Sequence, residues 1–468
     1  MAQFVNRVSE LATLEAWWQR PGAQLGVVWG RRRVGKSWLL SHWAKDRRAI
    51  FHVARNRSTE EELRALSRAT AEVVRLPRRS LIDRPFVSWD DAFEVLAGAA
   101  ERQRLLVIID EVPELFEADP QLPSVLRALW DGVQDSKLRL ILAGSAVRTM
   151  ERMQQERAPL YGRATLRLLL SPFEPHEAAL MLPDLTPPER AKAWGVCGGV
   201  PYYLSLWDQA VDFATNLDRL VCSPQGALLN EGDLVLATED FAGGRRERLP
   251  EQVLRAIAGG HNRFSEIKTA LGTDPTRVLA ALQDLRLIER VTPVGAKPSG
   301  RLATYRIADN FLAFWLRVLE RHRPNIERGL GRGVRDVMLE EFDDYMGYRW
   351  EDAFRSYVRR AFADDPRTRP LVEVGAYWSS RSLASEPPIE IDAVGLTGRQ
   401  RLVTLAGEAK WAKSANAGRL ARTLRRKVEE SNLPAGDDTL LVVCAREQLD
   451  RVPDDALVVP VTGYDVFG

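Results

Sequence analysis

Short apolar runs that end in glycine or in polar residues recur along the first third of the chain. The clearest three are Leu25–Trp29, Leu105–Ile109 and Leu138–Ala143. Runs of this length that are almost wholly apolar, rather than alternating, are typical of strands buried on both faces of a parallel sheet. Weaker strand patterns at residues 49–55 and Ala164–Leu170, with helical patterns between them, predict an α/β core with a parallel sheet over residues 1–172.

Four further regions follow, each with its own pattern. Residues 173–248 are mostly helical in pattern, and residues 249–308 predict three short helices followed by two short strands, which is typical of a winged helix. Residues 309–345 contain an apolar, aromatic helix and a charged connecting stretch. Residues 346–468 predict a helix at Gly347–Phe362, then strands, then a basic helix, and so a second α/β domain.

The residues between the first apolar run and the next helix fit the pattern G-x-x-x-x-G-K-[ST]. They are Gly30, Arg31, Arg32, Arg33, Val34, Gly35, Lys36 and Ser37, and Trp38 continues into the helix. Glycines in such a loop let backbone N–H groups wrap around phosphate oxygens at the positive end of a helix. Lys36 is therefore predicted to contact the β- and γ-phosphates of ATP, and Ser37 to give its hydroxyl to Mg²⁺. The alternative is a chance glycine turn beside a basic residue, which does not explain why the pattern lies between a predicted strand and a predicted helix.

Two acidic residues follow the second apolar run directly. They are Asp110 and Glu111. Because ligands of parallel sheets bind at the carboxyl ends of the strands, we expect both side chains beside the glycine-rich loop. Asp110 is predicted to hold the Mg²⁺ shell and Glu111 to polarise the attacking water. A core strand that ends in a solvated turn is the alternative interpretation.

The C-terminal region carries a second group of charged residues on predicted strands. Alternation in the stretch Leu402–Trp411 places Glu408 and Lys410 on one face, and Asp392 lies in the preceding strand. Two carboxylates and a lysine beside a sheet can bind Mg²⁺ or Mn²⁺ and act on a phosphodiester, with Lys410 stabilising charge on an oxygen. A salt-bridged sheet surface without chemistry is the alternative.

A basic helix is predicted directly after these strands, at residues 417–432. Its cations are Arg419, Arg422, Arg425, Arg426 and Lys427. A basic stripe beside the carboxylates would suit a nucleic-acid backbone, although a solvated helix face is the commoner case. The third helix of the predicted winged helix has only one basic residue, Arg277. This favours packing of the helix on the rest of the chain over recognition of DNA.

Composition narrows the classes of function. The formal net charge of +2 over 468 residues means that no global field draws the chain to nucleic acid or membrane, so any basic surface is local. The three cysteines lie far apart and the five histidines form no ligand pattern, which suits a reducing compartment. No signal-peptide pattern and no apolar run long enough to span a bilayer is present, so the sequence predicts a cytoplasmic protein with no membrane association.

The order of these motifs resembles the archaeal-type ATPases of the AAA+/STAND lineage. The stretch Phe4-Val5-Asn6-Arg7 resembles the opening of those ATPases, although Asn6 replaces their usual glycine, and Gly199-Val200-Pro201 resembles their G-x-P motif. The resemblance implies that Arg7 and Pro201 lie against the nucleotide base and that residues 173–248 form a helical lid. It also implies ATP hydrolysis.

The same resemblance suggests roles for two residues near strand ends. Ser145 follows the third apolar run, where these ATPases carry a residue that senses the γ-phosphate, although a helix N-cap is an equal alternative. Arg163 precedes the fifth predicted strand, where AAA+ proteins often place an arginine that completes the ATP site of a neighbouring copy. The alternative for Arg163 is a solvent-facing arginine.

The C-terminal pattern EIDAVG…GEAKW resembles the PD-(D/E)xK nucleases, which have a restriction-endonuclease-like fold. Asp392, Glu408 and Lys410 match the nuclease motif, and Glu351 matches the acidic residue of the first helix. The resemblance implies a cutting site made of these four residues, with Asp392 and Glu408 as metal ligands and DNA as substrate.

Two hypotheses follow for the whole chain. The first is an ATP-hydrolysing protein whose nucleotide state controls a metal-dependent nuclease domain on DNA. The second is a STAND-type nucleotide-controlled switch or interaction protein whose C-terminal domain does not cut. A homo-oligomer or a partner protein is a separate expectation for the chain.

Overall fold

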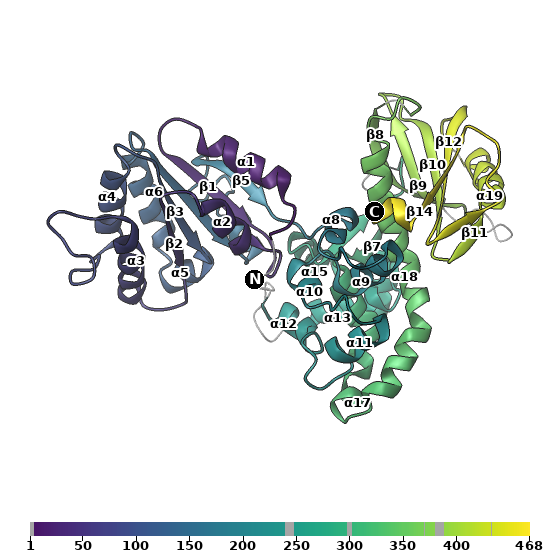
Figure 1. Ribbon diagram of the computed structural model, residues 1–468, viewed down its shortest axis with the longest axis horizontal. Helices are drawn as coiled ribbons and strands as arrows, with labels where there is room; N and C mark the ends of the chain where they lie inside the picture. The colour runs from purple at the N-terminus through teal and green to yellow at the C-terminus, as the bar shows by residue number, and fades with distance from the viewer. Residues whose placement is uncertain (1–3, 239–247, 297–301, 369, 380–387, 432) are drawn as a thin grey trace. The chain divides into compact units, whose positions relative to one another are not determined.

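The computed structural model describes residues 4–238, 248–296, 302–368, 370–379, 388–431 and 433–468. The chain divides into two compact units, Met1–Ser171 and Pro172–Gly468 (Figure 1). The division lies one residue from the predicted end of the α/β core at residue 172. Each unit is described by itself below.

The first unit contains a five-stranded parallel sheet. Its strands are β1 (Gln24–Trp29), β2 (Ala49–Val53), β3 (Leu105–Asp110), β4 (Leu138–Gly144) and β5 (Ala164–Leu169). Their order in the sheet is β2-β3-β4-β1-β5, and every pairing is parallel. The predicted parallel sheet is confirmed. Since the strands are parallel, their carboxyl ends share one edge, which carries the glycine-rich loop after β1 and the acidic residues that end β3.

Helices cover both faces of this sheet. They are α1 (Val8–Trp18), α2 (Lys36–Ala44), α3 (Thr59–Val73), α4 (Trp89–Ala99), α5 (Val112–Ala118), α6 (Leu122–Gly132) and α7 (Val147–Arg152). Neighbouring strand residues alternate between two separate cores. Val28 and Ile108 pack in a cluster with α1 and α2, whereas Val27 and Ile109 pack in the cluster that holds α3, α4 and α6. This burial on both faces explains the continuous apolar runs.

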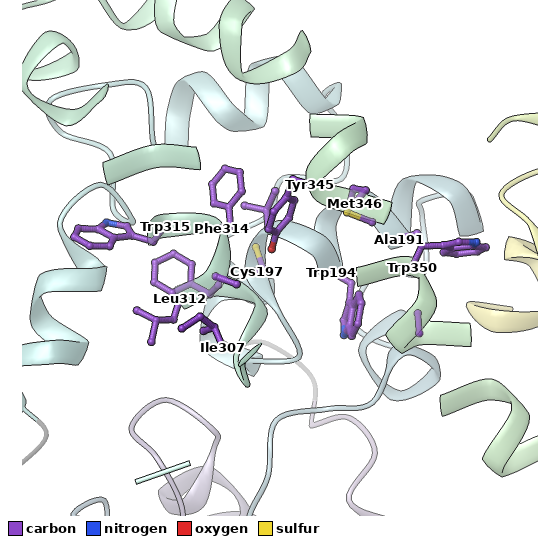
Figure 2. Packing of buried hydrophobic residues seen from close by; sticks show 14 of the residues in the cluster. Ala191, Trp194, Cys197, Ile307, Leu312, Phe314, Trp315, Tyr345, Met346 and Trp350 are labelled. Carbon is purple, nitrogen blue, oxygen red and sulfur yellow. The ribbon is translucent and has the colours of Figure 1, made fainter. Parts of the chain in front are cut away.

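The second unit begins with helices around a large apolar core. They are α8 (Pro175–Ala179), α9 (Pro187–Cys197), α10 (Pro201–Ser205), α11 (Phe213–Leu220), α12 (Glu231–Thr238), α16 (Asn310–Phe314), α17 (Arg323–Glu327) and α18 (Gly331–Ala361). Figure 2 shows Phe314 and Tyr345 side by side in this core, and Trp194, Trp315 and Trp350 belong to the same buried cluster. A π-helical turn, Trp315–Leu319, continues α16, so the predicted apolar helix near residue 310 is buried, as expected.

The helix predicted at Gly347–Phe362 is longer than the sequence pattern indicated. Helix α18 begins at Gly331 and runs for 31 residues, so the boundary predicted between residues 345 and 346 lies inside it. Both Tyr345 and Trp350, on either side of that boundary, are buried in the same core. Most of the charged stretch that was expected to connect two domains, residues 331–345, is the first half of one helix, because its apolar positions at Val334, Met338 and Phe342 continue the buried face.

A three-helix segment and a hairpin lie between α12 and α16. They are α13 (Leu249–Ala258), α14 (Phe264–Leu271), α15 (Thr276–Asp284), β6 (Ile288–Val291) and β7 (Thr304–Ile307). The two strands pair antiparallel. The helix and strand order expected over residues 249–308 is present, and its assignment as a winged helix stays a prediction.

The C-terminal part is a five-stranded mixed sheet. Its strands are β8 (Leu371–Trp378), β9 (Glu390–Thr397), β10 (Leu402–Lys410), β12 (Ala435–Ala445) and β14 (Val458–Thr462), in the order β14-β12-β10-β9-β8. Strands β8, β9 and β10 pair antiparallel, whereas β10, β12 and β14 pair parallel. Helices α18 and α19 (Ala417–Glu430) both contact β10. Smaller elements are β11 (Ser414–Asn416), β13 (Gln448–Asp450) and α20 (Gly463–Val466).

In the part of the chain that the structure describes, no helix combines the length and the apolar character needed to cross a bilayer.

Candidate functional site

The loop between β1 and α2 has a backbone that only glycine permits at two places. Gly30 has a φ of 156°, and a Cβ atom there would lie 2.3 Å from the carbonyl oxygen of Leu170. Gly35 has a φ of 92° and directly precedes the first residue of α2. The two glycines of the pattern are therefore required by the fold of the loop, and the loop leads into a helix N-terminus as a phosphate-binding loop does.

The Lys36 side chain lies over this loop. Its Nζ donates hydrogen bonds to the carbonyl oxygens of Gly30 at 2.9 Å and Arg31 at 3.1 Å. Lys36 is 5% exposed, so its ammonium group is held close to the loop backbone instead of extending into solvent. An ammonium held there is available to phosphate oxygens bound by the same loop.

The Ser37 hydroxyl donates a hydrogen bond to Oδ2 of Asp110. The loop after β1 and the end of β3 thus meet at one point, as the sequence predicted. Burial raises the pKa of Asp110, and the neighbouring Glu111 carboxylate raises it further. A hydroxyl and a carboxylate at one point are oxygen ligands of the kind that Mg²⁺ prefers, so these residues fit the ion that accompanies ATP.

Glu111 is held by Ser145. Its Oε2 accepts hydrogen bonds from the backbone N–H of Ser145 at 3.0 Å and from the Ser145 hydroxyl at 2.8 Å. Glu111 itself has a φ of 54°, a left-handed conformation that is uncommon outside glycine and that costs energy. Ser145 was predicted to sense a phosphate or to cap a helix. The structure places its hydroxyl on the carboxylate predicted to orient water, and the phosphate-sensing role stays a prediction.

Arg7 braces the loop from the other side. It is 5% exposed, and its Nη2 donates to the carbonyl oxygens of Val34 and Ser171, each at 2.9 Å. Its Nη1 pairs with Oε1 of Glu10 at 2.8 Å. These contacts connect the glycine-rich loop to the end of the unit, so the guanidinium positions the loop. The predicted contact with the nucleotide base stays a prediction.

Three other predicted residues lie in separate surroundings. Arg163 forms a bidentate ion pair with Asp131, with both side chains partly exposed. Trp38 contacts the ring of Phe4 edge to face. Pro201 begins α10 in the second unit, and its predicted contact with adenine stays a prediction.

The predicted C-terminal residues come together on β9, β10 and α18. Glu408 on β10 is 4% exposed, and its two carboxylate oxygens pair with two ammonium groups. Lys410 contacts Oε1 at 2.8 Å and Lys427 of α19 contacts Oε2 at 2.7 Å. Asp392 on β9 accepts a hydrogen bond from the backbone N–H of Ala409 at 2.8 Å.

Burial, together with neighbouring carboxylates, raises the pKa of two members of this cluster, Asp392 and Glu351. Burial raises the pKa of Asp392 to about 6, and the charge of Glu408 contributes. Burial likewise raises the pKa of Glu351 to about 8, with the charge of Asp392 as the next cause. Carboxyl groups that resist ionisation because they are buried beside like charges are typical of functional sites, and a bound cation favours their ionised form.

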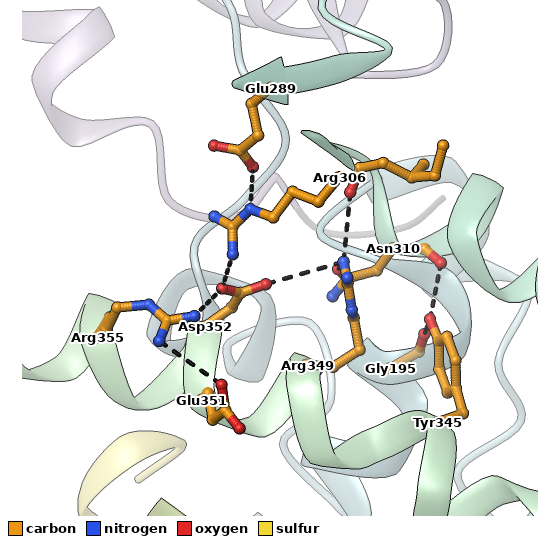
Figure 3. Close-up of polar contacts among 10 residues, drawn as sticks. Gly195, Glu289, Arg306, Asn310, Tyr345, Arg349, Glu351, Asp352 and Arg355 are labelled. Carbon is orange, nitrogen blue, oxygen red and sulfur yellow. Dashed lines mark hydrogen bonds and ion pairs between the residues drawn. The ribbon is translucent and has the colours of Figure 1, made fainter. Parts of the chain in front are cut away.

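An ion-pair network connects the cluster to the hairpin of the second unit. Figure 3 shows Asp352 on α18 in contact with Arg306, Arg349 and Arg355. Burial by itself would raise the pKa of Asp352, but the three guanidinium groups outweigh it and hold this pKa well below its usual range. Arg355 also donates to the backbone carbonyl of Asp392 at 2.6 Å and lies 3.8 Å from Oε2 of Glu351.

The acidic residues of this cluster are of the type that binds a hard cation such as Mg²⁺. Their present arrangement fits such an ion less well. The donors of the cluster are all carboxylates, but both oxygens of Glu408 already have ammonium partners. Among the residues that the structure describes, no group of three or more His, Cys, Asp or Glu side chains is arranged to hold a metal ion. A divalent ion would therefore have to compete with Lys410 or Lys427 for Glu408.

Two residues of the cluster were not predicted from the sequence. Lys427 appeared only as one of the cations of the basic helix, and its contact with Glu408 depends on how α19 packs on β10. Arg355 follows Glu351 by four residues on the same helix, which is a spacing that brings side chains together and could have identified it. Of the other predicted cations, Arg425 pairs with Asp455 at 3.0 Å.

Family models match two parts of the chain. Residues 4–206 match a family described as an ATPase domain predominantly from Archaea. Those residues are an ATPase domain of this archaeal type. Residues 315–421 match a family of archaeal and bacterial proteins of unknown function. The ATPase domain therefore holds the glycine-rich loop, Asp110 and Glu111, and the second match spans the carboxylate cluster.

Three known proteins are similar to this chain in sequence or in fold. An uncharacterized protein of Methanocaldococcus jannaschii is 26% identical over 433 residues, covering 91% of each chain. An uncharacterized ATP-binding protein of the same organism is 40% identical over 48 residues, which cover 10% of this chain and 81% of that protein. A Walker-type ATPase of Pyrococcus abyssi shares the fold, with a TM-score of 0.53 and 23% identity over 67% of this chain and 96% of that one.

Proposed function

We propose that the ATPase domain binds ATP with Mg²⁺ at the loop between β1 and α2, and hydrolyses it with Glu111 as the residue that orients water. The observation that carries this proposal is the pair of hydrogen bonds at one edge of the sheet, from Ser37 to Asp110 and from Ser145 to Glu111. Mg²⁺ held at Ser37 and Asp110 would offset negative charge on the phosphate oxygens.

The residues of the chain divide the remaining work. The Lys36 ammonium exchanges the carbonyl oxygens of Gly30 and Arg31 for phosphate oxygens, which satisfies its hydrogen bonds in both states. The Glu111 carboxylate accepts a hydrogen bond from the attacking water and directs it at the γ-phosphate. Ser145 keeps that carboxylate in place, and Arg7 holds the loop in the shape that receives the phosphates.

Replacement of Lys36 tests the proposal. Lys36→Ala removes the cation from the loop and is expected to lower ATP turnover by about 100-fold, as the loss of one electrostatic contact to a transition state does. The matched control is Lys45→Ala, because Lys45 is an exposed lysine at the end of the same helix. Phosphate release and binding of a fluorescent ATP analogue are the measurements. Equal turnover in both variants would contradict the proposal.

We further propose that the C-terminal mixed sheet is a restriction-endonuclease-like domain that cleaves DNA with Mg²⁺ or Mn²⁺. The convergence of Glu351, Asp392, Glu408 and Lys410, with the raised pKa of the first two, supports it. A divalent ion there would lower the pKa of a bound water. Lys410, once its contact with Glu408 is given up, would offset charge on an oxygen of the phosphodiester.

Plasmid nicking in the presence of Mn²⁺ and ATP tests the nuclease proposal. Asp392→Asn and Lys410→Ala are both expected to abolish nicking, whereas Lys413→Ala, at an exposed lysine three residues further along, is the control. Nicking that is equal in wild type and Lys410→Ala would exclude the site.

The two lysines on Glu408 favour the alternative, a nucleotide-controlled switch whose C-terminal domain does not cut. That alternative predicts stably bound ATP or ADP in the purified protein, no nicking at any metal concentration, and a partner captured only by protein with Lys36 intact.

A further inference from the structure

A basic cavity lies at the edge of the first sheet that is opposite to the ATP site. Its lining residues come from the end of α1 and from the segments that lead into β2, β3 and β4. These strands are parallel, so the segments before them meet at one edge, whereas Lys36, Asp110 and Glu111 lie at the other. The cavity is therefore separate from the site described above.

Most of the side chains that line this cavity are cationic. Apart from Arg139, which is described below, they are Arg20, Arg47, Arg48, Arg102, Arg104 and Lys137. Asp46 also lines the cavity, and Glu15 on α1 pairs with Arg47. Two carboxylates do not balance this number of cations, so the cavity concentrates positive charge in a chain whose formal net charge is only +2.

A further arginine forms the inner wall of the cavity. Arg139 on β4 is 1% exposed, and its guanidinium donates hydrogen bonds to backbone carbonyl oxygens, including that of Trp18 at 3.2 Å. These carbonyl groups are neutral dipoles, so they hold the Arg139 guanidinium in place without cancelling its positive charge. Burial lowers the pKa of Arg139 to about 10, with repulsion from Arg104 as the second cause, so it is still cationic at neutral pH. The positive potential thus extends from the surface into the wall.

The indole of Trp18 holds these arginines in position. The guanidinium carbons of Arg47, Arg104 and Arg139 lie 5.4, 5.6 and 5.8 Å from the centre of the Trp18 ring. Cation–π contacts at these distances restrict the side chains before any ligand arrives. An anion that binds here meets ordered donors and loses little affinity to the ordering of flexible side chains.

We propose that this cavity is a second phosphate site, and that it takes a chain of phosphate groups. Guanidinium forks match two phosphate oxygens at once, which is why arginines and not only lysines suit this ligand. Arginines from several separate segments suit several phosphates in a row better than one. The phosphate chain comes either from the backbone of single-stranded nucleic acid or from a free polyphosphate, and the experiment separates these two sources.

The test uses the full chain with its ATP site filled by saturating Mg²⁺ and ADP. The two probes are a fluorescein-labelled single-stranded oligonucleotide and inorganic tripolyphosphate. The variant is Arg102→Ala/Lys137→Ala, because both side chains are exposed and their removal leaves the core intact. The control is Arg64→Ala/Arg68→Ala, which removes two exposed arginines from α3, away from the cavity.

The variant is expected to bind the oligonucleotide at least about tenfold more weakly and to lower the slope of log affinity against log salt by about 1.4, or 0.7 for each lost phosphate contact. Loss of binding for both probes assigns the site to free polyphosphate as well as nucleic acid, and loss for the oligonucleotide alone assigns it to the nucleic-acid backbone. If the variant binds both probes as tightly as wild type and the control, the proposal is wrong. Equal thermal unfolding midpoints in the three proteins serve as the fold control.

Discussion

Two groups of acidic residues, one in the ATPase domain and one in the C-terminal part, differ in the hydrogen-bond and ion-pair partners of their carboxylates. Asp110 and Glu111 of the ATPase domain accept hydrogen bonds from serine hydroxyls and backbone N–H groups, which carry no net charge. Glu408 is held by two ammonium groups, and Glu351 and Asp392 lie beside the guanidinium of Arg355. Neutral donors orient a carboxylate and leave its charge for a cation, whereas ammonium partners compete with that cation. The first group is thus ready for a metal ion, and the second must first release a lysine.

The largest expected effect is on Glu111, the residue of the ATPase domain that we propose orients water. Glu111→Gln keeps the shape of the side chain but removes its negative charge, and we expect ATP turnover to fall by about 10³-fold while ATP binding persists. Single-turnover hydrolysis and nucleotide binding are the measurements. Turnover that falls in parallel with binding would mean that Glu111 holds the nucleotide and not the water.

Asp352 lies next to the C-terminal group of acidic residues. Asp352→Asn should lower the free energy of unfolding by about 3 kcal/mol, because Arg306, Arg349 and Arg355 would lose their shared partner. The folded-state pKa of Asp352 is lowered, so this contribution is fully present above the ordinary carboxyl pKa of about 4 and is lost as the pH falls through the folded value. Denaturant unfolding at pH 7 and pH 3 measures it. The gap between wild type and variant should narrow at pH 3, and a constant gap would contradict the assigned charge.

Replacement of Lys427 should make the C-terminal group more like that of the ATPase domain, because one oxygen of Glu408 loses its ammonium partner. Lys427→Met keeps the length of the side chain but frees one oxygen of Glu408, and we expect Mn²⁺ affinity of the nucleotide-free protein to rise about tenfold. Electron paramagnetic resonance titration measures free Mn²⁺. An Asp110→Asn background removes the contribution of the ATP site, and unchanged affinity there would show that Lys427 does not compete with the metal.

The smallest predicted effect measures how much the neutral hydrogen-bond donor Ser145 contributes to ATP turnover. Ser145→Ala removes one of the two hydrogen bonds to Glu111 and should lower ATP turnover about fivefold, or about 1 kcal/mol. The remaining backbone N–H explains why the loss is modest. Ser145→Thr, which restores the hydroxyl, should recover most of the rate. A loss as large as that of Glu111→Gln would instead indicate direct contact between Ser145 and phosphate.

The sequence predicted the parallel sheet and the meeting of Ser37 with Asp110 because both depend on local patterns. An apolar run that is buried on both faces looks the same in any parallel sheet, and loops after such strands share an edge. The cluster of Glu351, Asp392, Glu408 and Lys410 was also predicted, since the alternation along β10 sets the direction of two of its members.

Contacts that depend on tertiary packing were not predictable. The hold of Arg7 on Val34 joins residues 27 positions apart, and that of Lys427 on Glu408 depends on where α19 lies on the sheet. The start of α18 at Gly331 was missed because charged residues on its outer face hid the apolar positions of the inner one.

The length of α18 has a consequence for modularity. Its 31 residues span about 46 Å, at 1.5 Å for each residue, and one hydrophobic core holds both Trp194 of the helical region and Leu405 of the C-terminal sheet. The family match at residues 315–421 likewise runs from the buried π-helical turn into α19. A truncation at residue 345 would split a helix and uncover Trp350, so we expect the C-terminal sheet to fold only together with the helices that share its core.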